Sequence, residues 1–347
     1  MLGFLTRTRG KSRMDVTDIL AWAWLILGTL VIAIPIGWAF LSSFKPEAEI
    51  NSFPPTLLPR AAEELAIDGY DEPLPAYAWT DEQGETRTVG LVRRIGLKAT
   101  VVDPASPGER LSVDASAIEK QTVLRPEWSN YTDPLERFAF LTYLKNSVFV
   151  TTVATILTLV LNSMAAFALS KYRFRGSTTI FVLMLSTLML PLSVIMVPAF
   201  MVVVGLNLAD NLWGVIFSTV ATPTGVFLLR QYMLTIPDDL IEAARVDAAS
   251  EFRIYWRIIL PLSAPALAVL AIFSVIWRWN DFLWPLIVLS SPENYTLQLG
   301  LNAFQGQFTV QWHYILSMTV VALLPVTLIF LFLQRYITEG VASSGVK

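Results

Sequence analysis

Long apolar runs separated by shorter polar segments dominate the pattern of this chain. The first run extends from Leu20 to Phe44, about 25 residues, and follows a short basic segment. A helix of this length spans the hydrocarbon core of a bilayer. Five more runs of sufficient length lie at residues 147–169, 178–204, 212–229, 263–289 and 315–333. The pattern predicts an all-α polytopic membrane protein with six transmembrane helices.

The short segments between these runs differ in charge. Basic residues occupy the N-terminal segment and every second connection after it: Arg7, Arg9, Lys11 and Arg13; Lys171, Arg173 and Arg175; Arg230, Arg245, Arg253 and Arg257; Arg335 and Lys347. The alternate short connections carry little positive charge. Because lysine and arginine concentrate on the cytoplasmic side of membrane proteins, we expect both termini and the connection at residues 234–262 to be cytoplasmic.

The connection between the first two apolar runs is long and acidic. Residues 46–137 hold 17 acidic and 9 basic residues. Segments 77–80, 86–89, 98–102 and 111–113 have the pattern of short strands, with turn residues at 81–85, 103–104 and 107–108. We expect a small β-rich extracytoplasmic insert at about residues 60–125. It serves either as a rigid spacer that adds stability or as a contact surface for another protein.

Composition agrees with embedding in a membrane and excludes several kinds of site. Of the 347 residues, 54% are hydrophobic and 15% are charged, whereas soluble domains contain about 25% charged residues. The chain has no cysteine and a single histidine, His313. Disulfides, cysteine metal sites and multi-histidine metal sites are therefore excluded, and we expect neither a metal nor a cofactor.

A charged, helix-forming stretch at residues 242–261 interrupts the apolar pattern. Asp238 and Asp239 suit the start of a helix and the positive end of its dipole, and Pro261 suits its end because proline does not continue a helix. Ala248 favours an uninterrupted helix between them. Small alanines on one face would allow the backbone of another protein to come close, so the stretch indicates a docking element.

This stretch resembles the EAA loop of permease subunits of binding-protein-dependent, ATP-driven importers. The matching residues are Glu242, Ala243, Ala244, Asp247, Ile258, Leu260 and Pro261, while Ala248 replaces the glycine of the family pattern. The resemblance implies that the EAA loop, residues 234–262, forms short coupling helices that sit in a groove of the ATPase subunit. It implies a coupling role for Glu242, Ala243, Ala244, Asp247, Ala248 and Pro261.

A second motif lies in the fifth apolar run, from Trp277 to Pro285. Its tryptophans could stack on sugar rings while Asn280 and Asp281 bind hydroxyl groups, and the string resembles a signature of sugar permeases. The substrate-path candidates are Trp277, Asn280, Asp281 and Trp284. The structural alternative is an ion pair between Arg278 and Asp281, which are spaced for one helix face, together with an anchor at the membrane interface.

The chain is accordingly identified as a member of the carbohydrate branch of ABC importer permeases, the maltose-type smaller subunit. We expect it in the bacterial plasma (inner) membrane, without enzymatic activity of its own, with domains at 1–45, 46–140 and 141–347. The resemblance implies these partners: an ATPase dimer, a second permease subunit in a heterodimer, an extracytoplasmic solute-binding protein and lipid, but no nucleic acid. The alternatives are a permease for another small polar solute, a secondary transporter and an integral membrane enzyme.

Overall fold

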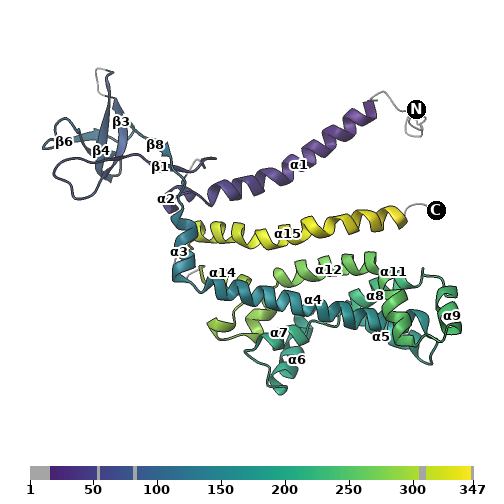
Figure 1. The fold of residues 1–347 in the computed structure, drawn as a ribbon. Helices are drawn as coiled ribbons and strands as arrows, with labels where there is room; N and C mark the ends of the chain where they lie inside the picture. The colour runs from purple at the N-terminus through teal and green to yellow at the C-terminus, as the bar shows by residue number, and fades with distance from the viewer. Residues whose placement is uncertain (1–15, 53–54, 81–83, 305–309, 345–347) are drawn as a thin grey trace. The chain divides into compact units, whose positions relative to one another are not determined.

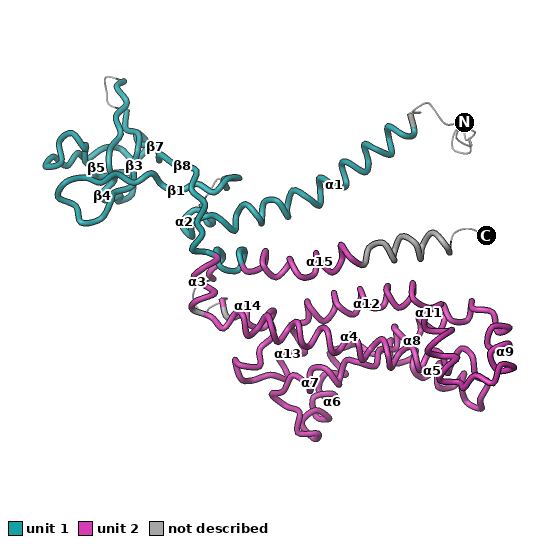
Figure 2. Tube along the Cα trace, in the orientation of Figure 1, with its two compact units in different colours: residues 1–130, 312–317 teal, residues 131–311, 318–347 magenta. Residues whose placement is uncertain are grey.

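The computed structural model describes residues 16–52, 55–80, 84–304 and 310–344 (Figure 1). The predicted basic N-terminal segment, positions 81–83 of the predicted hairpin loop and Lys347 lie outside the described residues. The chain divides into two compact units (Figure 2). The first contains residues 1–130 and 312–317, and the second contains residues 131–311 and 318–347.

The first unit begins with the helix α1 (Val16–Ser42), whose apolar side chains are exposed along its length. The short helix α2 (Glu47–Ile50) follows. Two buried contacts hold the end of α1 in place: the side-chain amide of Asn130 donates to the backbone carbonyls of Ser43 and Lys45, at 2.9 and 2.8 Å. The Lys45 side chain is buried and donates to the carbonyl of Thr56.

Eight short strands lie among the described residues of this unit. They are β1 (Arg60–Ala62), β2 (Glu64–Leu65), β3 (Leu74–Thr80), β4 (Thr86–Ile95), β5 (Lys98–Val102), β6 (Arg110–Asp114), β7 (Ile118–Lys120) and β8 (Thr122–Leu124). Strands β2 to β6 pair in chain order, β7 pairs with β3, and β1 pairs with β8. The four strand segments expected from the sequence are present within β3 to β6. Val89 and Val101 are fully buried in the sheet's core, as side chains that alternate between two faces require.

The second unit is helical and is built around α4 (Phe140–Lys171), which is preceded by the short helix α3 (Ser129–Arg137). The helices that follow α4 are α5 (Ser177–Ser186), α6 (Leu192–Gly205), α7 (Leu212–Phe217), α8 (Pro223–Met233), α9 (Asp239–Val246), α10 (Glu251–Ile254), α11 (Leu260–Leu262), α12 (Ala264–Trp279), α13 (Leu283–Val288), α14 (Leu297–Leu301) and α15 (Trp312–Ser344). Figure 1 shows α4 running through this unit, and α4 packs against both α8 and α12.

The helices match the six predicted spans only in part. Among the described residues, three helices are long and apolar enough to cross a membrane, and up to five spans result if two bent pairs each count as one. One pair joins α5 to α6 with a bend of 110°, and the other joins Glu251–Leu262 to α12 with a bend of 76°. The predicted fourth run instead forms two short helices, since Pro223 begins a new helix where its missing N–H costs nothing.

Candidate functional site

The EAA loop presents α9 with most of its predicted coupling residues accessible. Asp239 and Glu242 lie in the first turn, where negative charge favours the helix dipole. The exposed coupling residues are Glu242, Ala243, Asp247, Ala248 and Pro261. Ala244 is half-buried and packs against the unit's core, and Val246 at the end of the helix is 86% exposed. The exposed side of α9 therefore combines small and apolar side chains with acidic ones.

The expectation of one continuous helix through Ala248 is wrong. Helix α9 ends at Val246, and Ala248 has φ = 55°, in the left-handed region. A helix commonly ends with one residue in this conformation, which frees the chain to turn. The next helix, α10, begins after Ser250, whose hydroxyl accepts the backbone N–H of Arg253. The turn thus forms at the position of the family glycine although alanine occupies it.

Two further expectations about the ends of this stretch need correction. Pro261 does not end the helix, because helical structure continues through it to Leu262 and the bend falls at Ser263. Proline is tolerated there since it lies at the first turn of α11, after a π-helical segment. Asp238 stands at the N-cap position of α9, but its carboxylate does not cap the helix. It binds Lys171 instead.

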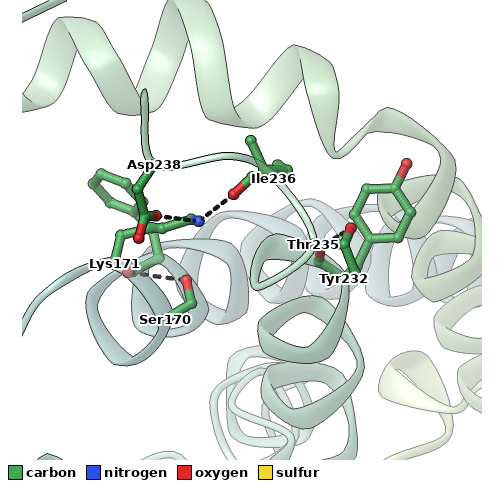
Figure 3. Close-up of polar contacts among 7 residues, drawn as sticks. Ser170, Lys171, Tyr232, Thr235, Ile236 and Asp238 are labelled. Carbon is green, nitrogen blue, oxygen red and sulfur yellow. Dashed lines mark hydrogen bonds and ion pairs between the residues drawn. The ribbon is translucent and has the colours of Figure 1, made fainter. Parts of the chain in front are cut away.

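Lys171, the last residue of α4, binds the start of the EAA loop. Figure 3 shows its ammonium group between the backbone carbonyl of Ile236 and the carboxylate of Asp238, at 2.6 and 2.7 Å. The Lys171 side chain is only 3% exposed, whereas that of Asp238 is 70% exposed. The hydrogen bond from Lys171 and its positive charge lower the pKa of the Asp238 carboxyl. Asp238 is therefore ionised at neutral pH.

The neighbouring Tyr172 binds the first residue of α10 and through it reaches the far end of α9. Its hydroxyl donates to Oε2 of Glu251 at 2.6 Å, and Oε1 of the same carboxylate accepts Nε of Arg245 at 2.8 Å. Burial and then the hydrogen bond to Glu251 raise the pKa of Tyr172 to about 12. The phenol consequently keeps its proton at physiological pH and remains a donor. Glu251 begins α10 and Arg245 lies in the last turn of α9.

Apolar contacts complete the seat of the EAA loop on the helices beneath it. Ile241 of α9 and Ile254 of α10 are 3% and 0% exposed. They belong to one buried cluster with Phe167 of α4 and Leu229 of α8. The Tyr255 hydroxyl also makes a buried 2.7 Å hydrogen bond with the hydroxyl of Ser163 in α4. The loop is thus held against α4 by both apolar and polar contacts.

A cavity of about 810 Å³ lies farther along the same unit, between α4, α8 and α12. Its polar lining includes Thr158, Thr222, Ser274, Asn280 and Asp281. The remainder is mostly apolar, and its volume lies within the range of small-molecule sites. Hydroxyl, amide and carboxylate groups beside an aromatic side chain, Trp277, can bind the hydroxyl groups and apolar faces of a polar solute.

The structure places the substrate-path candidates in two environments. Trp277, Asn280 and Asp281 line the cavity, with Trp277 60% exposed. The side-chain amide of Asn280 donates to the carbonyl of Ile276, one turn earlier in its own helix. Trp284 does not line this cavity: it is 8% exposed, and its indole N–H donates to the hydroxyl of Ser218 at 2.7 Å.

Among the described residues, no salt bridge joins Arg278 to Asp281, the structural alternative that their spacing allowed. The guanidinium of Arg278 donates instead to the hydroxyls of Thr158 and Ser274 and to the carbonyl of Thr219. These acceptors belong to α4, to α12 and to the segment after α7, so Arg278 joins three elements of this unit. Of the acceptors, Thr158 and Ser274 line the cavity. Asp281 accepts the backbone N–H of Trp284 at 3.3 Å. The spacing of the two residues allowed a pair on one helix face, but it gives no information about acceptors that other segments bring close to Arg278.

Two features of this unit escaped the sequence reasoning. Lys171 looked like one of several basic residues flanking an apolar run, and no signal tied it to Asp238. Asp210, between α6 and α7, accepts the backbone N–H groups of Ser290 and Ser291, both at 2.9 Å. Hydrogen bonds from Ser291 hold the pKa of the Asp210 carboxyl well below its usual range. Among the residues the structure describes, no cluster of three acidic or histidine side chains could hold a metal.

Comparison with known proteins adds a family and a fold. Residues 159–343 match the family described as binding-protein-dependent transport system inner membrane component. The arabinooligosaccharides transport system permease protein AraQ of Bacillus subtilis (strain 168) is 43% identical over 202 residues, which cover 58% of this chain and 72% of AraQ. The inner membrane ABC transporter permease protein YcjP of Escherichia coli (strain K12) is 33% identical over 232 residues, covering 65% and 83% of the two chains.

A solved structure shares the fold over most of this chain. It is a chain of a bacterial ABC transporter involved in the import of the acidic polysaccharide alginate, with a TM-score of 0.68 and 22% identity. The match covers 95% of the present chain and 100% of the other.

Proposed function

This chain belongs to the family of binding-protein-dependent transport system inner membrane components, and we propose that it is the permease subunit of an ATP-driven importer for a carbohydrate. Similarity to an arabinooligosaccharide permease and to a chain of an alginate importer supports a carbohydrate over another small polar solute. These relatives are named as transport proteins, so ATP hydrolysis belongs to a partner subunit.

The observation that carries the proposal is the exposed face of α9. Glu242, Ala243 and Val246 are accessible on a helix whose opposite side is seated on the unit's core. An exposed helix face that combines small residues with an exposed valine and a carboxylate can pack closely against a partner's groove and form hydrogen bonds at its edge. We assign this face to the groove of a cytoplasmic ATPase dimer. The left-handed turn at Ala248 then separates the docking helix from α10.

The cavity is the proposed share of this subunit in the translocation path. Trp277 would stack on a sugar ring, while Asn280 and Asp281 would bind hydroxyl groups. Closure of the ATPase dimer on ATP would move α9 and shift the helices around the cavity. Trp284, which packs in the core, would support this wall rather than contact the sugar.

The finer topology completes the proposal. We take six membrane crossings: α1, α4, the bent pair α5–α6, α7 together with α8, α12, and α15. On this count both termini and the EAA loop would be cytoplasmic, and the β-rich segment would lie outside, between the first two crossings. The family's inner-membrane assignment and the positive charge around the EAA loop support this orientation. The partners are an ATPase dimer, a second permease subunit and an extracytoplasmic binding protein.

The decisive experiment changes the exposed alanine of α9. Ala243→Arg adds a long charged side chain to the docking face without entering the core. A charge buried without a partner at an interface costs on the order of 2–5 kcal/mol, so co-purification of the ATPase should fall by more than tenfold. ATP-dependent uptake from a panel of labelled oligosaccharides by membrane vesicles should fall in parallel.

The matched control is Ala105→Arg, an exposed alanine in the loop between β5 and β6. It should leave both measurements unchanged. Normal ATPase co-purification and uptake in Ala243→Arg would refute the docking role. Uptake of amino acids or ions but of no oligosaccharide in the unmodified complex would refute the carbohydrate assignment.

A further inference from the structure

Lys171, the last residue of α4, and Tyr172, the next residue, connect to the two ends of α9: Lys171 directly at its start, and Tyr172 through Glu251 of α10 at its end. We propose that Lys171 and Tyr172 are positioning residues that transmit the movement of α9 to α4 and thereby to the cavity. The inference rests on the proposed function of α9 as the ATPase docking helix. Neither residue lies on the exposed face of α9, so the role is transmission rather than docking.

Lys171 provides the attachment at the start of α9. A lysine whose side chain is 3% exposed requires strong partners, because an uncompensated buried charge is costly. Its two partners, the Ile236 carbonyl and the Asp238 carboxylate, both lie in the short connection between α8 and α9. Asp238 occupies the N-cap position, so movement of α9 pulls directly on this bond (Figure 3).

Tyr172 provides the attachment at the other end. Through Glu251 it reaches both the first residue of α10 and, by way of Arg245, the last turn of α9. Lys171 and Tyr172 therefore bind segments on both sides of the turn at Ala248. A helix bound at one end can swing about that point, whereas binding at both ends makes α9 and the end of α4 move together.

Helix α4 leads from these attachments to the cavity without an interruption. It is continuous over 32 residues, and about 20 Å separates Lys171 from Thr158 along it at 1.5 Å per residue. Thr158 accepts Arg278 at 2.7 Å, Thr155 bonds Ser274 at 2.8 Å, and Asn162 donates to Thr222 at 2.6 Å. These bonds connect α4 to helices on the far sides of the cavity, so displacement of its end changes the cavity wall.

The test compares transport with ATP consumption in the assembled complex. Lys171→Met keeps the apolar stem of the side chain and removes the ammonium. We expect ATPase co-purification to be unchanged, while the amount of oligosaccharide imported per ATP falls by at least about fivefold, the lower end of typical coupling between sites. Tyr172→Phe should also lower the amount of oligosaccharide imported per ATP. Lys171→Arg keeps the positive charge and should retain most of the parent value. Arg175→Met, at an exposed cation in the same connection, is the matched control.

A distance measurement tests directly whether Lys171 fixes α9 relative to the end of α4. The chain has no native cysteine, so Phe174→Cys and Leu240→Cys introduce one pair of exposed spin-label sites, one in the connection after α4 and one in α9, outside the residues assigned to the docking face. The distance distribution should be narrow in the parent chain and in Arg175→Met. It should broaden in Lys171→Met and narrow again in Lys171→Arg.

The outcomes separate this inference from the proposed function. The transmission role would be overturned if Lys171→Met and Tyr172→Phe both import as much oligosaccharide per ATP as the parent chain and both keep a narrow distribution of the distance between the two labels. Loss of ATPase co-purification in Lys171→Met would also overturn it, because Lys171 would then be needed to form the docking site itself. Should Lys171→Met fail to fold, Tyr172→Phe decides alone. Normal docking in Ala243→Arg, by contrast, refutes the proposed function whatever the Lys171 variants do.

Discussion

At the scale of single residues, Ala248 combines a strained conformation with an essential turn. A residue other than glycine in the left-handed region is disfavoured by about 1–2 kcal/mol, and Ala248 has φ = 55°. Ala248→Gly should therefore raise the thermal midpoint of the purified complex. The relief of strain exceeds the cost of the greater conformational entropy that glycine gives the unfolded chain, for a net gain of up to about 1 kcal/mol. Ala248→Val should lower it, because branching at Cβ increases the clash. A lower midpoint for the glycine variant would show that the turn is not strained.

At the scale of elements, the contact between α4 and α8 depends on Gly225. A Cβ at this position would lie 2.3 Å from Nδ2 of Asn162 and 2.5 Å from Oγ1 of Thr222. Gly225→Ala should thus break the Asn162–Thr222 hydrogen bond and separate the helices, at a cost of about 1–3 kcal/mol for overpacking. Thermal unfolding measures this cost. Gly205→Ala is the control, because a Cβ there meets no other atom within 4 Å, and equal effects of the two would contradict the close contact.

At the scale of the whole molecule, the β-rich segment can be removed at a natural junction. Strands β1 and β8 are antiparallel partners with Arg60 opposite Leu124, and such partners lie about 5 Å apart. A short Gly/Ser linker can therefore replace residues 61–123 without displacing the flanking chain. We expect unchanged ATPase co-purification, measured after purification of the complex, because the EAA loop belongs to the other compact unit.

The same variant distinguishes the two roles considered for this segment. If the segment is a spacer, we expect the binding protein to stimulate ATP turnover normally in this variant. If the segment is a contact surface for the binding protein, we expect that stimulation to be lost. Loss of ATPase assembly would contradict a separate module.

The sequence by itself determined the features that depend on neighbours along the chain. Apolar run length identified α1, α4 and α15 as candidate spans, and alternation with turn residues identified β3 to β6. The EAA residues and the tryptophan motif were located because each is a local string. The predictions of these helices and strands succeeded because helix and strand periodicity, span length and turn preference act over a few residues to a few turns. The roles of the two motifs stay predictions.

Only the tertiary structure decided which of these residues meet. The Arg278 guanidinium binds Thr158 and Thr219, which are 120 and 59 positions away, rather than Asp281, three positions away. Lys171 selects Asp238 across 67 positions. The tertiary structure also determined the turn at Ala248, where helix propensity favoured a continuous helix. The physical reason is the same in each case: a buried donor or a seated helix takes the partners that packing places around it, and packing is a property of the whole fold.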